Sequence, residues 1–163
     1  MSSAPSSQTS KRADQTVPVE RAEISFATSD EEAIEIHRFL CVIAQPVLYA
    51  PIDPHDSMRG VLDVVHNGAA IVARLSGHII GSLGLIMPRW WYNTKAGFIT
   101  DRWFFCYPAF HHLGVGASLL AEADALGKRA GREVIINGHM KRRSSGVSFT
   151  RPTVLGAAKP ELH

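Results

Sequence analysis

The chain has 163 residues, 45% of them hydrophobic and 20% charged, which suits one globular domain with a substantial core. Its formal net charge of +2 is too small to predict nucleic acid as a partner. No apolar run approaches the roughly 20 residues that a membrane span needs, and the N-terminus lacks an apolar signal core. The expected compartment is therefore the cytoplasm.

Cysteine usage agrees with a reducing compartment. Cys41 and Cys106 are the two cysteines, and each lies within an apolar run. We expect buried thiols, although the sequence alone leaves a disulfide between them open. No set of cysteines and histidines has the spacing of a zinc site, so no metal is expected.

Composition divides the chain into three parts. Residues 1–20 are rich in Ser, Thr, Gln and Pro and contain few large apolar side chains, so we expect a tail outside the fold. Residues 21–155 carry the hydrophobic patterning and form the predicted domain. Residues 156–163 are expected to be a loose C-terminal tail.

The first elements of the domain follow from periodicity and capping signals. Alternation predicts a strand over residues 23–27. Ser29 or Asp30 can cap a helix that ends before Pro46. Its expected apolar face is Ile34, Ile36, Leu40 and Ile43. A second helix, ending near Gly68, is expected to bury Met58, Val61, Leu62 and Val65.

A β-hairpin and a further strand are predicted next. Residues 69–75 and 78–87 read as two strands joined by a tight Ser76-Gly77 turn. Residues 88–97 read as an aromatic and basic connector, and residues 98–107 as the fourth strand.

The clearest helix spans residues 114–130. Its apolar stripe is expected to consist of Val115, Leu119, Ala123, Leu126 and Ala130, since these recur at spacings of three and four. Residues 133–137 then read as a fifth strand, which completes a βαβ unit. Residues 147–149 are expected to form a last short strand or helix.

The segment that joins the fourth strand to this helix carries the strongest functional signal. It reads Pro-Ala-Phe-His-His-Leu-Gly-Val-Gly over residues 108–116. A strand that leads through glycines into a helix presents unpaired backbone amides and the positive end of the helix dipole. Such a loop can bind phosphate, because glycine lets the ligand approach the backbone closely.

The order of elements and this loop resemble the GNAT superfamily of acyl-CoA-dependent N-acetyltransferases. Proline, the aromatic residue, the β-branched residue and the last two glycines agree with the family's cofactor loop. His111 stands at the family's Arg or Gln position and His112 at its first glycine. The resemblance implies an α/β (α+β) fold: a mixed, mostly antiparallel central sheet with helices on both faces and a βαβ cofactor unit.

The resemblance also implies acetyl-CoA as the co-substrate. Its pyrophosphate would face the backbone amides of Leu113, Gly114, Val115, Gly116 and Ala117. Phe104, Phe105 and Cys106 would border the pantetheine arm, and His111 and His112 would reach the phosphates or remain exposed loop residues. The thioester would lie where the fourth and fifth strands separate.

Catalytic and acceptor residues are assigned less directly. Asp101 is the candidate general base for the acceptor ammonium, with a structural ion pair to Arg102 or Arg89 as the alternative. In the family the acid for the thiolate is often a tyrosine after the fifth strand. No tyrosine follows Tyr107 in this chain, so the resemblance leaves Ser144 as the candidate acid. Trp90, Trp91 and Tyr92 would hold a cationic amine by cation–π contacts or would cover the sheet.

Three functions remain at this point. The first is an N-acetyltransferase that moves an acetyl group to the primary amine of a small molecule or peptide by direct attack. The second is a catalytically weak GNAT-like module that binds acyl-CoA or a protein. The third, a nucleic-acid-binding protein using the basic run 141–143, is disfavoured by the net charge. A homodimer is left open by the sequence.

Overall fold

The computed structural model describes residues 21–137 and 153–155. The expectations for the N-terminal tail, Ser144, the basic run 141–143, residues 147–149 and the C-terminal tail lie outside these residues. The boundaries of the domain therefore remain a prediction.

The helical elements are α1 (Asp30–Ala44), η1 (Gln45–Val47), α2 (Pro54–Asn67), η2 (Pro108–Leu113) and α3 (Val115–Ala130). The strands are β1 (Glu23–Ala27), β2 (Ala69–Leu75), β3 (His78–Ile86), β4 (Arg89–Trp90), β5 (Asn93–Gly97), β6 (Ile99–Cys106), β7 (Val134–Ile136) and β8 (Thr153–Leu155).

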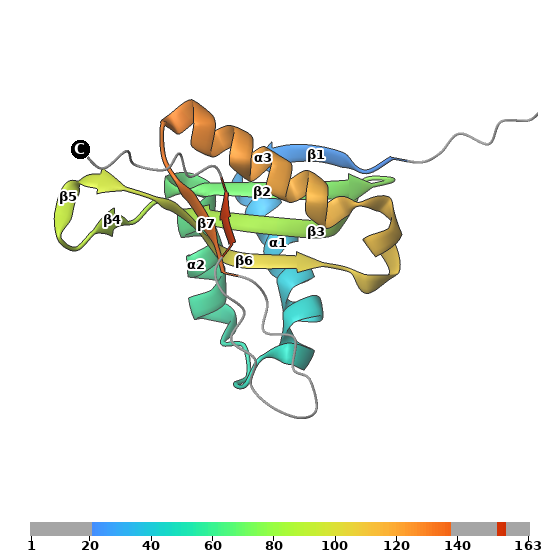
Figure 1. Cartoon of the computed structure of the whole chain (residues 1–163). Coiled ribbons are helices and arrows are strands. Elements are labelled where there is room, and N and C mark those ends of the chain that lie inside the picture. The colour runs from blue at the N-terminus through green and yellow to red at the C-terminus, as the bar shows by residue number, and fades with distance from the viewer. Residues whose placement is uncertain (1–20, 138–152, 156–163) are drawn as a thin grey trace, which may run out of the picture.

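Six of these strands form the central sheet, in the order β1-β2-β3-β6-β7-β8. Neighbouring strands are antiparallel except for β6 and β7, which are parallel and joined through α3. A parallel pair requires a long crossover connection, and α3 supplies it. The expected mixed, mostly antiparallel sheet with a βαβ unit is confirmed (Figure 1).

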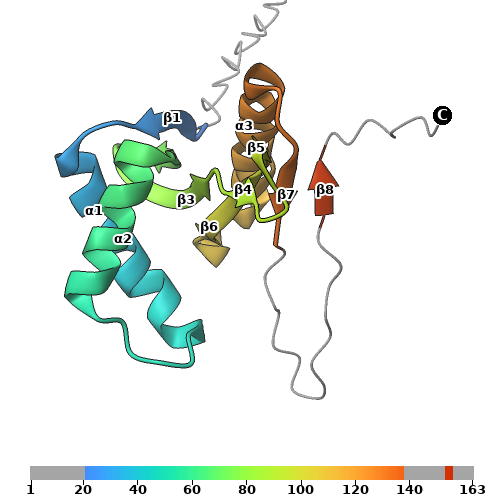
Figure 2. The ribbon, with the colours of Figure 1, turned by 90° about the vertical axis from the view of Figure 1, so that its left-hand side faces the viewer.

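Helices cover both faces of the sheet (Figure 2). Helices α1 and α2 pack on one face, where Ile36, Val61 and Val64 form a cluster with Val72 and Trp103. Helix α3 packs on the other face with a second apolar cluster. That cluster contains Ile71, Leu83, Ile99, Leu119 and Val134.

Local signals in the sequence account for several element ends. Ser29 is the N-cap of α1, and its side chain forms a reciprocal capping box with Glu32, which satisfies helix amides that have no helical partner. Ser76 and Gly77 turn the β2–β3 hairpin with φ angles of 48° and 81°. Positive φ at both central positions matches the right-handed twist of the two strands.

Two elements differ from the sequence expectations. The connector over residues 88–97 is a small antiparallel ribbon, β4–β5, outside the main sheet. It is held by Trp90, whose ring stacks on Phe98 at 4.2 Å and on Tyr92 at 5.5 Å between centroids. Strand β8, which the sequence did not predict, pairs with β7.

The buried faces of two helices also differ in part. On α1, the predicted Ile36 is fully buried, but Ile34 is 41% exposed. The core-facing stripe runs through Ala33, Ile36 and Phe39 instead. On α3, Ala130 is exposed and Gly127 is buried in the stripe. A β-carbon on Gly127 would lie 2.3 Å from Cγ2 of Val134, so close packing of α3 on β7 selects glycine there.

Within residues 21–137 and 153–155, every helix is too short or too polar to cross a membrane.

Candidate functional site

Strands β6 and β7 run together for only a short distance. They share two registered pairs, Ile99 with Val134 and Thr100 with Ile135. Strand β6 then continues to Cys106, whereas β7 ends at Ile136, and the two strands diverge in Figure 1. The fold therefore produces the separation of the fourth and fifth main strands that the resemblance implied.

Asn137 joins the two strands at the point where their pairing ends. Its backbone N–H donates to Oδ1 of Asp101 at 2.7 Å, and its side-chain amide donates to Oγ1 of Thr100 at 3.1 Å. The structure thus gives Asp101 a backbone partner, and the alternative ion pair with Arg102 or Arg89 is not formed among the described residues. Oδ2 of Asp101 has no partner in the part of the chain that the structure describes.

A β-bulge follows Asp101 on β6. Gly84 pairs with Trp103 and Leu85 pairs with Asp101, which leaves Arg102 as the extra residue between the two pairs. A bulge breaks the strict alternation of side chains. As a result, Arg102 and Trp103 both line the cavity described below.

The glycine loop lies at the end of β6. Gly114 has φ 67° and its N–H donates to the carbonyl of His111 at 3.1 Å, so this amide is removed from the expected set of phosphate donors. The first helical bond of α3 runs from Ser118 N–H to the Gly114 carbonyl at 3.0 Å. No side chain caps α3. The backbone amides of Val115, Gly116 and Ala117 come before the first helical hydrogen bond and therefore have neither a helical acceptor nor a side-chain cap.

At Gly116 the N-terminus of α3 packs against side chains of β6. A β-carbon at Gly116 would lie 3.5 Å from Cζ of Phe104 and 4.0 Å from Sγ of Cys106. These are ordinary contact distances, so packing within the protein does not require glycine at this position. His111 and His112 lie exposed on the loop.

Burial also changes the chemistry of Cys106. Desolvation raises the pKa of its thiol from 9.0 to about 11, because the charged thiolate is disfavoured where water is excluded. Cys106 and Cys41 are both free and half-buried, which excludes the disulfide that the sequence left open and corrects the expectation of full burial.

On the opposite face of the sheet, a cavity of about 330 Å³ opens between α1, α2 and β6. This volume lies in the range of small-molecule sites. The cavity is lined by His37, Leu40, Cys41, Ala44, Leu48, Ile52, Asp56, Ser57, Gly60, Val61, Arg102, Trp103 and Phe105.

The polar groups of this cavity are largely engaged. Nε2 of His37 lies 2.8 Å from Oγ of Ser57, and Oγ donates to the carbonyl of Asp53 at 2.6 Å. Since the hydroxyl proton is used on that carbonyl, Oγ accepts from a protonated Nε2. Sγ of Cys41 lies 3.5 Å from Nε2 of His37.

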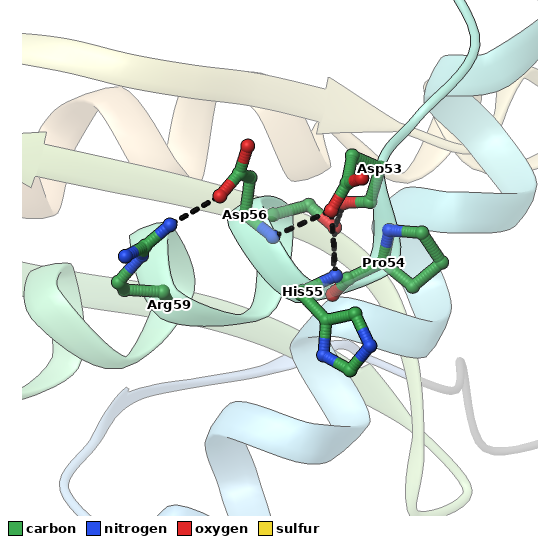
Figure 3. A network of polar contacts seen from close by, with 6 residues as sticks. Asp53, Pro54, His55, Asp56 and Arg59 are labelled. Carbon is green, nitrogen blue, oxygen red and sulfur yellow. Dashed lines mark hydrogen bonds and ion pairs between the residues drawn. The ribbon is translucent and has the colours of Figure 1, made fainter.

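The acidic loop before α2 has a structural role. The Asp53 side chain accepts from the backbone amides of His55 and Asp56 at 2.9 Å each and caps the helix (Figure 3). Asp56 forms an ion pair with Arg59 (Figure 3).

The structure brings Phe104, Cys106 and Asp101 onto the diverging strand and places the loop candidates, residues 111–117, directly after it. The remaining candidates among the described residues lie elsewhere. Phe105 lines the cavity on the opposite face. Trp90, Trp91 and Tyr92 lie on the β4–β5 ribbon, which joins the start of β6, whereas the glycine loop follows its end (Figure 1). Trp91 is 90% exposed.

Sequence reasoning did not assign His37, Ser57 or Arg102 to a site. His37 and Cys41 are spaced i,i+4 and share a helix face, which is a signal the sequence does contain. Their meeting with Ser57 and Arg102 depends on the packing of α1, α2 and β6, which no local pattern encodes.

Known proteins resemble this chain in structure rather than in sequence. No protein-family model matches the sequence, and no curated protein matches it. A GNAT family acetyltransferase from Brucella melitensis in complex with acetyl-CoA is 19% identical, with a TM-score of 0.61, covering 86% of this chain and 92% of that one. Ribosomal-protein-alanine N-acetyltransferase from Brucella melitensis biovar Abortus 2308 is 14% identical, with a TM-score of 0.60, covering 74% of this chain and 81% of that one.

A third structural neighbour is an aminoglycoside acetyltransferase from an uncultured soil metagenomic sample, solved in complex with sisomicin. It is 13% identical with a TM-score of 0.54, and the match covers 80% of this chain and 92% of the other. These likenesses show that the chain has the fold of GNAT family acetyltransferases, and the expected resemblance is confirmed at the level of the fold.

Proposed function

We propose that this chain transfers an acetyl group from acetyl-CoA to an amine. The observation that carries this proposal is the uncapped N-terminus of α3. In this GNAT fold it packs on β6, along the part of that strand that has separated from β7. Backbone amides and the helix dipole favour a bound phosphate there. A structural neighbour with this fold holds acetyl-CoA.

The cofactor would occupy the α3 side of β6. The amides of Val115, Gly116 and Ala117 would bind the pyrophosphate, and the pantetheine arm would run along β6 past Phe104 and Cys106. His111 and His112, exposed beside these amides, can add hydrogen bonds to phosphate. Among the described residues, no group of three or more His, Cys, Asp or Glu side chains could hold a metal ion.

The acceptor would enter from the α1–α2 side, through the cavity next to the bulge of β6. Its amine loses a proton, the nitrogen forms a bond to the acetyl carbon, the carbon–sulfur bond breaks, and the thiolate of CoA takes up a proton. Asp101 is the proposed base, because its Oδ2 has no partner among the described residues. Release of the thiolate needs no strong acid, since thiol pKa values lie near 8.5, and Ser144 remains the proposed proton source.

A GNAT-like module that binds acyl-CoA without turnover is the second candidate. It is favoured by the loop itself, where His111 and His112 replace the arginine and glycine of the family pattern. Histidine is a weaker partner for phosphate than the bidentate, permanently charged guanidinium.

Calorimetric titration with acetyl-CoA tests the cofactor site. We use a Gly116→Glu variant, which places a carboxylate against the pyrophosphate, and an Ala121→Glu variant on the exposed face of α3 as the matched control. Binding by the parent and the control but not by Gly116→Glu supports the site. Absence of binding to the folded parent at millimolar acetyl-CoA contradicts it.

A thiol-release assay over a panel of amines then separates the two candidates. Release of CoA that depends on an amine supports the transferase. Tight binding of acetyl-CoA with no release for any amine supports the binding module.

A further inference from the structure

We propose that the acceptor is an α-amino acid with an apolar side chain, whose carboxylate is bound by Arg102 in the cavity between α1, α2 and β6. This inference rests on the proposed acetyl transfer and names its acceptor class. It follows from the chemistry of the described lining residues, which combine an apolar interior with Arg102, a cation that has no partner among the described residues, and with one carboxylate, Asp56, that is already paired.

The interior of the cavity favours an apolar group. Leu40, Val61, Trp103 and Phe105 contribute to its wall from α1, α2 and β6, so that all three elements supply apolar surface. Removing an apolar side chain from water into such a wall is favourable by about 25 cal/mol per Å². At about 330 Å³ the cavity is of a size for one small molecule.

The described lining residues are poorly matched to a polycation. Asp56 is the one carboxylate among them, and it is paired with Arg59. His37 and Ser57 are hydrogen-bonded to each other. An acceptor with several ammonium groups would therefore meet fewer anionic partners than it has charges.

Arg102 supplies the specific contact. Its guanidinium has no ion pair or hydrogen bond within residues 21–137 and 153–155, and the β-bulge turns it toward the cavity beside Trp103. Arginine binds carboxylates through two parallel hydrogen bonds. We infer that this side chain receives an anionic group of the acceptor.

The position of Arg102 restricts the acceptor further. It directly follows Asp101, which lies where β6 and β7 diverge and where the acetyl group would be transferred. We infer that the anionic group and the reacting amine are separated by few bonds in the acceptor. An α-amino acid meets this requirement, since its amine and carboxylate share one carbon atom.

Acetyl transfer to matched acceptors tests the proposal. Phenylalanine, phenylalaninamide, 2-phenylethylamine, spermidine and sisomicin differ in their charges, and phenylalanine should have the highest kcat/KM. We expect a preference of about tenfold or more over phenylalaninamide, because one charge-assisted hydrogen bond accounts for that factor. Equal rates for the acid and the amide, or a preference for spermidine or sisomicin, would overturn the proposal while leaving acetyl transfer intact.

An Arg102→Gln variant should abolish the preference for phenylalanine over its amide, mainly through a higher KM for phenylalanine. Arg38→Gln, an exposed arginine of α1 that does not line the cavity, is the matched control and should keep the preference. If the Arg102→Gln variant still prefers phenylalanine over phenylalaninamide as strongly as the parent, Arg102 does not bind the carboxylate.

Alkylation of Cys41 gives a readout that does not depend on turnover. Cys41 lines the cavity, so bound phenylalanine should slow its reaction with iodoacetamide, and spermidine should not. The alkylation experiment tests the acceptor site even if the protein does not bind acetyl-CoA and the proposed function is wrong. Protection by phenylalanine that Arg102→Gln removes supports the acceptor site, and absence of protection overturns it.

Discussion

The carboxylate of Asp101 on β6 accepts a hydrogen bond from the backbone N–H of Asn137, directly after β7, at 2.7 Å. This contact fixes the point at which two parallel strands stop pairing and begin to diverge. One carboxylate oxygen is therefore structural, and the other has no partner among the described residues.

Replacing Asp101 with asparagine separates these two roles. The amide oxygen of Asp101→Asn can still accept from Asn137, so we expect a loss of only about 1 kcal/mol in the free energy of unfolding. Without a basic carboxylate, kcat should fall about 100-fold or more, while acetyl-CoA affinity stays the same. Asp101→Ala removes the acceptor atom as well and should cost about 1.5–3 kcal/mol. An Asp101→Asn variant with unchanged kcat would exclude Asp101 as the base.

Gly116 offers a test in which affinity and stability change in different directions. The β-carbon of Gly116→Ala fits beside Phe104, and alanine favours a helix over glycine by up to about 1 kcal/mol. The melting temperature should therefore hold or rise, while acetyl-CoA affinity falls because the methyl group obstructs the approach to the amides. Gly114→Ala is the contrasting variant. Its φ of 67° strains any side chain and should cost about 1 kcal/mol or more. Unchanged affinity in Gly116→Ala would contradict a phosphate at this position.

The buried hydroxyl of Ser82 supports the wall of the cavity. Nε1 of Trp103 donates to Oγ of Ser82 at 3.0 Å, and Ser82 is fully buried. Ser82→Ala leaves the indole N–H without a partner and should cost about 1–3 kcal/mol in urea unfolding. Ser25→Ala, at an exposed position of β1, should change stability by less than about 0.5 kcal/mol. A neutral Ser82→Ala would show that Trp103 does not depend on this bond.

The two thiols should react at different rates. Because the pKa of Cys106 is raised to about 11, only about one molecule in a thousand carries its thiolate at pH 8. Peptide mapping after iodoacetamide treatment at pH 8 should therefore find Cys41 modified well before Cys106. The Cys106 rate should rise about tenfold per pH unit toward pH 11. Equal modification of both thiols in the folded protein would contradict the burial of Cys106.

The same shift has a consequence for stability. The folded state keeps the Cys106 proton to a higher pH than the unfolded chain, in which the pKa is near 9. The associated stabilisation is thus complete below pH 9 and is lost as the pH rises toward 11. A Cys106→Ala variant should show a weaker loss of stability across this range in thermal denaturation.

Much of the fold could be predicted because local physics specifies it. Ser29 and Glu32 encode the start of α1, Ser76-Gly77 the hairpin turn, and Gly131 the end of α3 with its φ of 60°. Asp124 and Lys128, four residues apart on α3, form an ion pair at 2.6 Å. Each depends on residues within four positions of each other, so the sequence carries the whole signal.

Other elements could not be predicted because distant residues decide them. The β4–β5 ribbon depends on the stacking of Trp90 on Phe98. Strand β8 is three residues long and is recognisable through its pairing with β7. Periodicity does not reveal either contact, and short strands have little pattern of their own.

For the candidate site the division is equally physical. The glycine loop can be recognised from residues 108–116 alone, because a strand, two glycines and an amphipathic helix in succession leave helix amides without a backbone partner. Which amides stay unpaired, where β6 and β7 diverge, and how Arg102 meets His37 and Ser57 at one cavity all depend on contacts between distant residues. Those relationships are set by the packing of α1, α2 and β6 and by a bulge in strand register, and neither is a property of neighbouring residues.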